Sequence, residues 1–204
     1  MVGSNGEHLL QQRYATKRRA EAFYEHQVIN FLNEEMKQFI SLQNMVFIST
    51  ADGNGECDSS FRAGEQGFVR VIEDKILCFP EYRGNGVMAS LGNILENPHI
   101  GLLFIDFERG VGLHINGKAE IIENEQLSMK VREGLARELI SYEGLRLERW
   151  VFIEVEEAYI HCSKHIPKFI AIAKDISWGT DDEIRKGGDY FKVKAMKARK
   201  VKLK

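Results

Sequence analysis

The chain has 204 residues, a formal net charge of −2 and a hydrophobic fraction of 44%. This length predicts one domain with a sizeable core, and the near-neutral charge gives no reason to expect a nucleic-acid-binding protein. No apolar run approaches the ~18 residues that a membrane span needs. The three cysteines form no CxxC pair and the polar N-terminus shows no secretory signal, so we expect a cytoplasmic location.

Residues 1–44 predict a helical segment that caps the rest of the fold. A charged helix is expected over residues 7–22. Apolar residues at helical spacing predict a second helix over residues 23–42. We interpret the basic cluster from Arg13 to Arg19 as a solvated helix face.

Several short strands follow, each separated from the next by a turn. A β-prone run over residues 45–50 meets a hairpin turn at residues 51–55, and the return strand spans residues 57–62. Two-residue alternation puts Ser60 and Arg62 on one face of that strand. A further hairpin is expected over residues 68–72 and 75–79. Such closely spaced strands favour an antiparallel barrel over a parallel sheet.

A polar turn rich in glycine separates the strand that ends before Pro80 from a short helix expected over residues 87–95. The turn reads Tyr82-Arg83-Gly84-Asn85-Gly86. Glycines let the backbone approach a ligand, an arginine offers a fork of donors, and a helix N-terminus favours anions. Ser90 and Asn93 lie on one face of the helix. The turn therefore predicts an anion site, with an ordinary strand-turn-helix connection as the alternative.

The second half continues the β pattern and ends in a long tail. Strands are expected over residues 100–106 and 112–123, a helix over residues 124–139, and a strand over residues 149–162 with a bulge at Glu156-Glu157. The tail over residues 169–204 predicts loops with short helices, and its aromatic residues suggest that it wraps a subunit. From Lys192 to Lys204 it has seven basic residues and no acidic one. This basic end is either a solvated terminus or an arm for an anionic partner.

Three motifs occur in the order typical of one family: Cys57 to Gly64, Glu96 to Phe104 and Leu113 to Glu120. Together they resemble the FMN-binding split-barrel family, the relatives of pyridoxamine 5'-phosphate oxidase. The resemblance covers residues 45–168 and implies a mainly β fold, an antiparallel split β-barrel of six to eight strands with flanking helices. It also implies a homodimer with FMN at the subunit interface and an FMN-dependent oxidoreductase activity.

The resemblance also implies a set of cofactor-binding residues. Arg62, Arg83 and Lys164 are the cations that would meet around the FMN phosphate. His161 corresponds to a strand end that reaches the flavin across the dimer. A metal site at His161, Cys162 and His165 lacks an evident fourth ligand, so we expect none. The whole predicted set is Ser60, Arg62, Tyr82, Arg83, Gly84, Asn85, Ser90, Asn93, His161 and Lys164.

The chain departs from the oxidase proper at three places. Ala89-Ser90 stands where the oxidase has an Arg-Lys pair, Gly112 stands where it has a glutamine, and its C-terminal Arg-x-His motif is absent. These departures argue against pyridoxamine phosphate oxidation and leave FMN binding in place. The chain shows no nucleophilic triad, P-loop or Rossmann fingerprint, so the cofactor would carry any chemistry.

Several alternatives stay open at this point. The substrate, the electron donor and the electron acceptor are not indicated, nor is enzymatic activity itself. The barrel could be a non-catalytic flavin or haem binding protein, or a scaffold with a basic interaction tail. A deazaflavin with a similar phosphate-bearing tail would suit the same residues as FMN.

Overall fold

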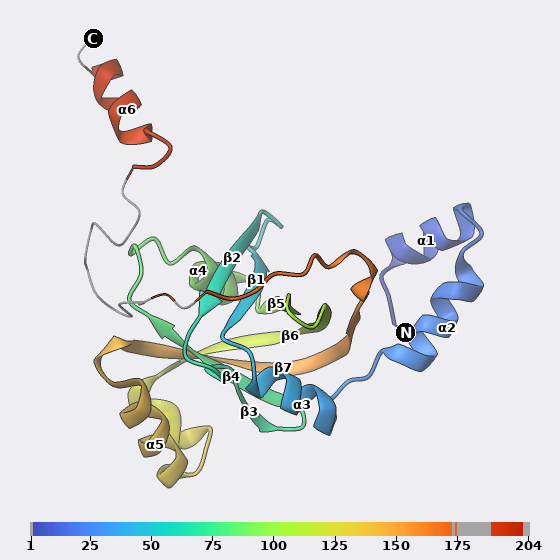
Figure 1. The fold of residues 1–204 in the computed structure, drawn as a ribbon, viewed down its shortest axis with the longest axis horizontal. Helices are drawn as coiled ribbons and strands as arrows, with labels where there is room; N and C mark the ends of the chain where they lie inside the picture. The colour runs from blue at the N-terminus through green and yellow to red at the C-terminus, as the bar shows by residue number, and fades with distance from the viewer. Residues whose placement is uncertain (1, 173, 175–188, 202–204) are drawn as a thin grey trace.

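The fold is one antiparallel sheet that curls into a split barrel. The computed structural model describes residues 2–172, 174 and 189–201. Its seven strands follow the order β2-β1-β5-β6-β7-β4-β3, and every adjacent pair is antiparallel (Figure 1). They are β1 (Met45–Ala51), β2 (Cys57–Ala63), β3 (Arg70–Glu73), β4 (Ile76–Tyr82), β5 (His99–Asp106), β6 (Val111–Glu123) and β7 (Leu147–His161). The predicted antiparallel split barrel is thereby confirmed.

The longest strand pair, β6 with β7, contains the expected bulge. Asn116 pairs with Glu157, but the next residue, Gly117, pairs with Val155. Glu156 is therefore the additional residue of β7, as the change of apolar phase predicts. Bulges bend a strand and increase its twist, which helps a sheet of this width to curl.

β4 runs further than the sequence indicates. Pro80 does not end it, because β4 continues to Tyr82 and Pro80 pairs with Trp150 of β7. β3 pairs only with the first residues of β4, as far as Cys78. Pro80 thus lies where β4 has one neighbouring strand, and its missing N–H costs no ladder hydrogen bond.

Two apolar clusters hold the sheet. The larger lies inside the barrel and includes Ile48, Phe79, Phe104 and Ile115. The smaller lies against the other face of β4 and β7 and contains Cys78, Trp150 and Phe152 together with Leu139 of α5 (Glu133–Glu143). Burial raises the pKa of the Cys78 thiol, which is therefore a structural residue.

The N-terminal segment differs from the two helices expected. α1 (Asn5–Arg13) ends where Ala15 takes a left-handed φ of 53°, and α2 (Lys17–Gln27) follows. α3 (Glu34–Ser41) begins only after an extended stretch. In that stretch Ile29 exchanges two backbone hydrogen bonds with Ala158, of 3.0 and 2.7 Å. The prediction of one helix over residues 23–42 is wrong because the edge of β7 offers these backbone partners.

The remaining helices are short. α4 (Ala89–Glu96) follows β4, and the helix expected over residues 124–139 is divided into the 3-10 helix η1 (Asn124–Met129) and α5. Two further 3-10 turns, η2 (Gly144–Arg146) and η3 (Ser163–His165), flank β7, and α6 (Val193–Val201) lies near the C-terminus. Within the described ranges, no helix is long and apolar enough to cross a membrane. Of the tail aromatics, Phe169 packs on Phe107, and Trp178 lies outside the described residues.

Candidate functional site

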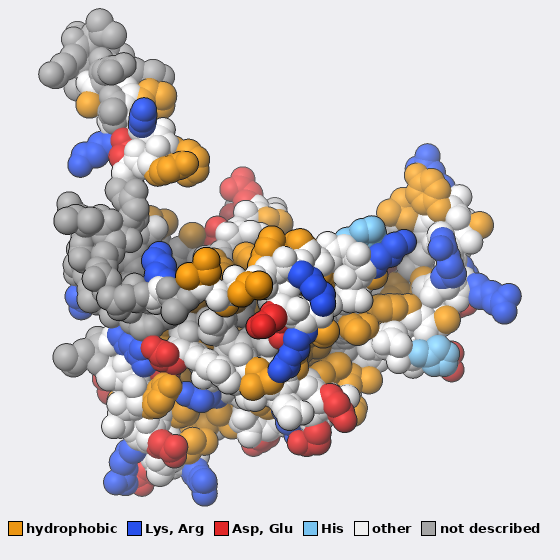
Figure 2. All heavy atoms as spheres, in the orientation of Figure 1, with side chains coloured by type: hydrophobic (Ala, Val, Ile, Leu, Met, Phe, Trp, Pro, Cys, Tyr) orange, Lys and Arg blue, Asp and Glu red, His pale blue; other side chains and the backbone are white. Residues whose placement is uncertain are grey.

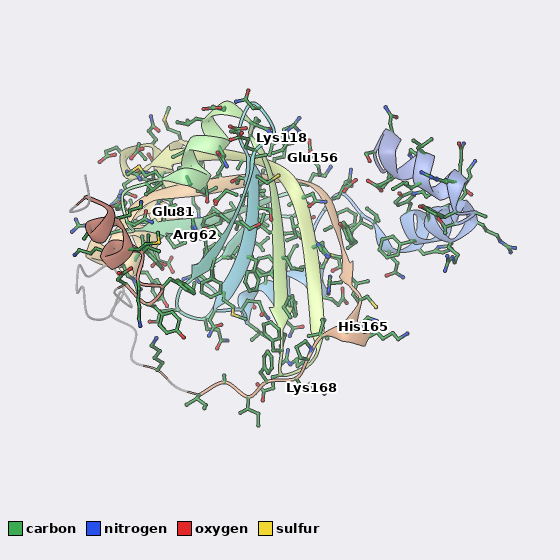
Figure 3. The ribbon with its side chains drawn as sticks, turned by 90° about the horizontal axis from the view of Figure 1, so that it is seen from above. Arg62, Glu81, Lys118, Glu156, His165 and Lys168 are labelled. Atoms are coloured by element: carbon green, nitrogen blue, oxygen red, sulfur yellow. The ribbon has the colours of Figure 1, made fainter. Side chains whose placement is uncertain are left out.

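The predicted phosphate residues of β2 lie on one face of the strand, as expected. Arg62 donates from Nη1 to the hydroxyl of Ser60 at 2.6 Å. Its Nε donates to Glu81 Oε1, also at 2.6 Å, and Figure 3 shows these two side chains side by side. Glu81 comes from β4, so the ion pair crosses the split between the two ends of the sheet. Burial raises the pKa of the Glu81 carboxyl, and the Arg62 guanidinium opposes that rise.

The start of α4 lies next to β2. Ser90 donates its hydroxyl proton to Asp58 of β2 at 2.8 Å, and Asn93 donates to Thr50 of β1 at 3.0 Å. The first helical hydrogen bond runs from Gly92 N to Met88 O, and no side chain caps the helix start. The amides of Ala89, Ser90 and Leu91 have no acceptor among the described residues and are available to a ligand, and the dipole favours an anion there.

The turn between β4 and α4 is open. A Cβ at Gly84 would meet no atom within 4 Å. Asn85 accepts a hydrogen bond from the Val87 amide at 2.9 Å, and Arg83 Nε lies 3.6 Å from Glu148 Oε1. Met88, just before α4, takes a left-handed φ of 56°. A bulky residue in this conformation is strained, and such strain concentrates at binding sites.

Tyr82 does not belong to this turn. Its hydroxyl donates to the carboxylate of Glu143 at 2.6 Å, and Glu143 is only 2% exposed. Arg146 completes the group, with Nε 3.3 Å from Glu143 and its guanidinium over the Tyr82 ring. The contacts hold the end of β4 against α5 and η2. Tyr82 thus faces the buried group and not the open turn.

His161 and Lys164 lie at the opposite end of β7 from Tyr82. Tyr82 pairs with Leu147 at the start of β7, whereas His161 ends that strand fourteen residues later. By contrast, strand register places Phe61, next to Arg62, four strand spacings from Tyr159, roughly 19 Å at ~4.8 Å per spacing. Figure 3 shows His165, next to Lys164, away from Arg62 and Glu81. Hydrogen bonds link the elements of Ser60, Arg62, Ser90 and Asn93, whereas among the described residues none joins His161 or Lys164 to this group.

The end of β7 has its own polar pair. Nε2 of His114 lies 2.7 Å from Nδ1 of His161, and the His114 ring stacks on Tyr159. Burial, with a smaller contribution from His161, lowers the pKa of His114. A Cβ at Gly112 would lie 2.7 Å from the His161 Cβ. The histidine pair therefore needs glycine at the position where the oxidase has a glutamine.

Sequence reasoning missed the acidic partners. Asp58 shares the face of Ser60 and Arg62 by two-residue alternation, so its place beside the site could have been found. The places of Glu81 and Glu143 could not have been found from the sequence, because they depend on which strands and helices end side by side.

The donor set suits the phosphate end of FMN. It combines a guanidinium, two hydroxyls and an uncapped helix start, which are the groups that bind phosphate. The carboxylates of Asp58 and Glu81 occupy part of this donor capacity. A phosphate would therefore compete with Glu81 for Arg62 and with Asp58 for Ser90.

Comparison with known proteins establishes the family. The family model for pyridoxamine 5'-phosphate oxidase matches residues 32–162, more than half of the chain. The chain therefore belongs to the pyridoxamine 5'-phosphate oxidase family. No curated protein matches the chain.

Solved structures with a similar fold are distant in sequence. HupZ from Group A Streptococcus is 22% identical, with 63% of this chain and 93% of that chain covered and a TM-score of 0.48. An FMN-binding protein from Syntrophomonas wolfei is 12% identical, with 80% and 99% covered and a TM-score of 0.47. HutZ, the heme storage protein from Vibrio cholerae, is 14% identical, with 63% and 94% covered and a TM-score of 0.40. Likeness at this level does not indicate what this chain binds.

Proposed function

We propose that this protein binds FMN and serves as a flavin-dependent oxidoreductase whose substrate is still to be found. The observation that carries the proposal is the donor set of Ser60, Arg62 and Ser90 at the uncapped start of α4, in a chain of this family. A bound flavin would supply the redox chemistry by accepting a hydride or electrons itself. The residues of this chain would hold the phosphate and fix the cofactor in place.

Arg62 is the principal phosphate ligand in this proposal. On binding FMN, Arg62 would either leave Glu81 and bind the phosphate or bind both groups at once. A guanidinium has five N–H donors, which is enough for both. Arg83 would add a second positive charge from the open turn. Arg83→Ala would then lower FMN affinity, since a charge-assisted hydrogen bond contributes about 1.5–3 kcal/mol.

The proposal includes a homodimer with the cofactor at the subunit interface. Its support is the position of His165, next to Lys164, away from Arg62 and Glu81 (Figure 3). A second copy would bring the end of its own β7 to this site.

An absorbance spectrum of the purified protein, with mass spectrometry of what heat denaturation releases, tests the proposal. Bands near ~450 nm and released FMN would support it. A Soret band would indicate haem in place of flavin. A protein that stays colourless after FMN titration would contradict the proposal.

A further inference from the structure

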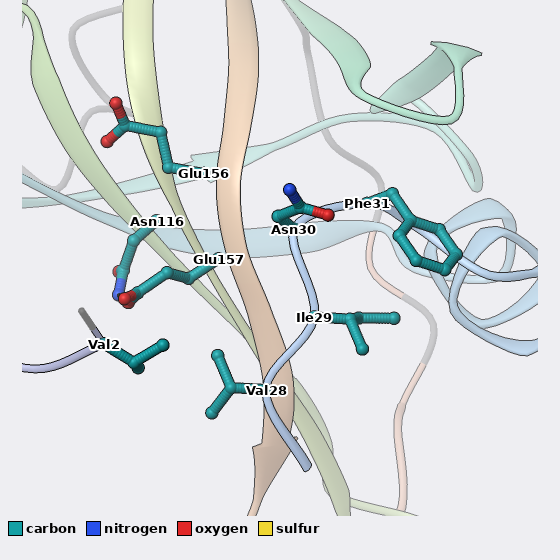
Figure 4. Close-up of a pocket in the computed structure, with 8 residues that line it drawn as sticks. All are labelled: Val2, Val28, Ile29, Asn30, Phe31, Asn116, Glu156 and Glu157. Carbon is teal, nitrogen blue, oxygen red and sulfur yellow. The ribbon is translucent and has the colours of Figure 1, made fainter. Parts of the chain in front are cut away.

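A hollow of about 690 Å³ lies where the N-terminal segment meets the sheet (Figure 4). Its apolar walls include Val2, Val28 and Phe31 from the N-terminal segment, and its polar walls include Asn116 of β6 and Glu157 of β7. Small-molecule sites usually have volumes of about 300–1,000 Å³ and mostly apolar walls with a few polar groups. The hollow has the size and the mixed lining of such a site.

Close packing sets the first residues of the chain at this hollow. Gly3 takes a left-handed φ of 85°, and a Cβ there would lie 2.6 Å from the Tyr24 hydroxyl oxygen. Glycine therefore lets the backbone pass against α2. The Ser4 hydroxyl then accepts from the Glu7 amide at 3.2 Å and caps α1. These contacts position Val2 in the wall of the hollow.

The stretch after α2 forms the other apolar wall. The backbone bonds between Ile29 and Ala158 hold this stretch against the edge of β7. Val28 before that bridge is half-buried, and Phe31 after it is 39% exposed. Figure 2 shows hydrophobic side chains on the surface where the barrel meets α1 and α2. A ligand in the hollow would therefore find apolar contact from the N-terminal segment.

Glu157 supplies the hollow with a carboxylate that has no counter-ion in the described part of the chain. Its Oε2 accepts a hydrogen bond from Asn116 Nδ2 at 3.2 Å, and Figure 4 shows the two side chains pointing toward one another. The neighbouring carboxylate, Glu156, pairs with Lys118 at 3.2 Å. Glu157 is half-buried, and a carboxylate in such a place is stabilised by a cation.

A second carboxylate adds to the negative charge at this end of the hollow. The Tyr24 hydroxyl, against which Gly3 packs, donates to Glu7 at 2.7 Å. This hydrogen bond is the main reason why the pKa of Tyr24 is raised, and the charge of Glu157 raises it further. The fields of both carboxylates thus meet at Tyr24, and their sum favours a positively charged ligand.

We propose that the hollow binds a small organic cation, a protonated amine attached to an apolar body. The ammonium group would pair with Glu157, and the apolar body would lie against Val28 and Phe31. A metal ion fits less well, because within the described ranges no group of three or more His, Cys, Asp and Glu could hold one. None of the residues assigned to the FMN phosphate lines the hollow, so the inference does not depend on the proposed function.

NMR titration of the full ¹⁵N-labelled chain tests the inference with three probes. Phenethylamine has an ammonium group and an aromatic body, 2-phenylethanol has the same body without the charge, and methylammonium has the charge without the body. Phenethylamine should shift the side-chain amide signal of Asn116 and the backbone amide signal of Val28, with a dissociation constant of about 1 mM or below. The other two probes should each bind at least about tenfold more weakly.

Glu157→Gln keeps the size of the side chain and an acceptor for Asn116, but removes the charge. It should weaken phenethylamine binding about tenfold and leave the binding of 2-phenylethanol unchanged. Glu138→Gln is the matched control, because it removes the same charge from an exposed position on α5, outside the walls of the hollow. Its dissociation constant for phenethylamine should equal that of the wild type.

Circular dichroism shows whether Glu157→Gln is folded, and the three probes test the wild type independently of any variant. No shift at ~10 mM phenethylamine would overturn the inference. Equal binding of phenethylamine and 2-phenylethanol would overturn it in favour of a purely apolar hollow. Equal binding of phenethylamine and methylammonium, or a folded Glu157→Gln with unchanged affinity for phenethylamine, would overturn it as well.

Discussion

Arg62 and Glu81 join the two ends of the sheet, because their strands, β2 and β4, lie on opposite sides of the split and their side chains meet at 2.6 Å. Both side chains are mostly buried, at 20% and 10% exposure. Removing one member of such a pair leaves the other charge buried without its partner. Arg62→Ala should therefore lower the free energy of unfolding by about 2–3 kcal/mol, measured by urea denaturation.

Arg137→Ala is the control for that measurement. Arg137 pairs with Glu133 on the surface of α5, with exposures of 74% and 71%. Surface pairs of this kind contribute only about 0.3–0.5 kcal/mol. Equal losses for Arg62→Ala and Arg137→Ala would show that the pair across the split does not stabilise the barrel.

The buried carboxyl of Glu81 should give stability an unusual dependence on pH. Its pKa in the folded protein lies above the ordinary value of 4.5, chiefly through burial, so the folded state holds the proton more tightly than the unfolded state. The contribution of Glu81 is therefore greatest below pH 4.5 and is lost as the pH rises through the folded pKa. The difference in unfolding free energy between wild type and Glu81→Gln should fall over that range. A difference that rises with pH would contradict this account.

His114 should give stability the opposite dependence on pH from that of Glu81. Burial and His161 lower its pKa below the ordinary 6.5, so the folded state favours the neutral imidazole. The stability that this provides is complete above pH 6.5 and is lost as the pH falls through the folded pKa. His114→Phe should lose less stability than wild type between pH 7.5 and pH 5, roughly the range in which an imidazole titrates. His165→Phe, which changes an exposed side chain, should keep the wild-type loss, and equal losses in all three proteins would rule out this role for His114.

Local patterns in the sequence predicted the antiparallel barrel and the part of the candidate site that lies on β2. Two-residue alternation placed Ser60 beside Arg62, and the change of phase at Glu156 located the bulge. Both features are set by neighbours in the chain. Tyr82 was assigned to the ligand turn because Pro80 resembles a strand end. In the fold β4 continues past Pro80, and no local pattern reveals that β3 stops short of it.

Contacts between residues far apart in the sequence cannot be predicted from such local patterns. Glu81 meets Arg62 only because β2 and β4 border the same split, and Ile29 leaves the helix expected there because β7 offers a bare edge. The separation of His161 from Tyr82 likewise follows from the length of β7. Each depends on strand order, which a single sequence does not encode locally.

Tyr82 should fix the turn that carries Arg83. Tyr82→Phe removes the hydroxyl bound to Glu143 and keeps the ring under Arg146. We expect FMN affinity to fall about tenfold, because the loss of one such hydrogen bond loosens the turn. Hydrogen exchange at residues 83–88 should become faster even without FMN. Tyr142→Phe is the control, since the Tyr142 hydroxyl makes no hydrogen bond to any described residue, and a matching effect there would exclude a specific role for Tyr82.

The most direct test of the phosphate site compares FMN with riboflavin, which has the same flavin ring and no phosphate. Fluorescence titration of the protein should give a dissociation constant for FMN about 100-fold or more below that for riboflavin, since several charge-assisted hydrogen bonds depend on the phosphate. Arg62→Ala should bring the two constants within about tenfold of each other. Equal affinities of the wild type for FMN and riboflavin would contradict the assignment of Ser60, Arg62 and Ser90 to the cofactor phosphate.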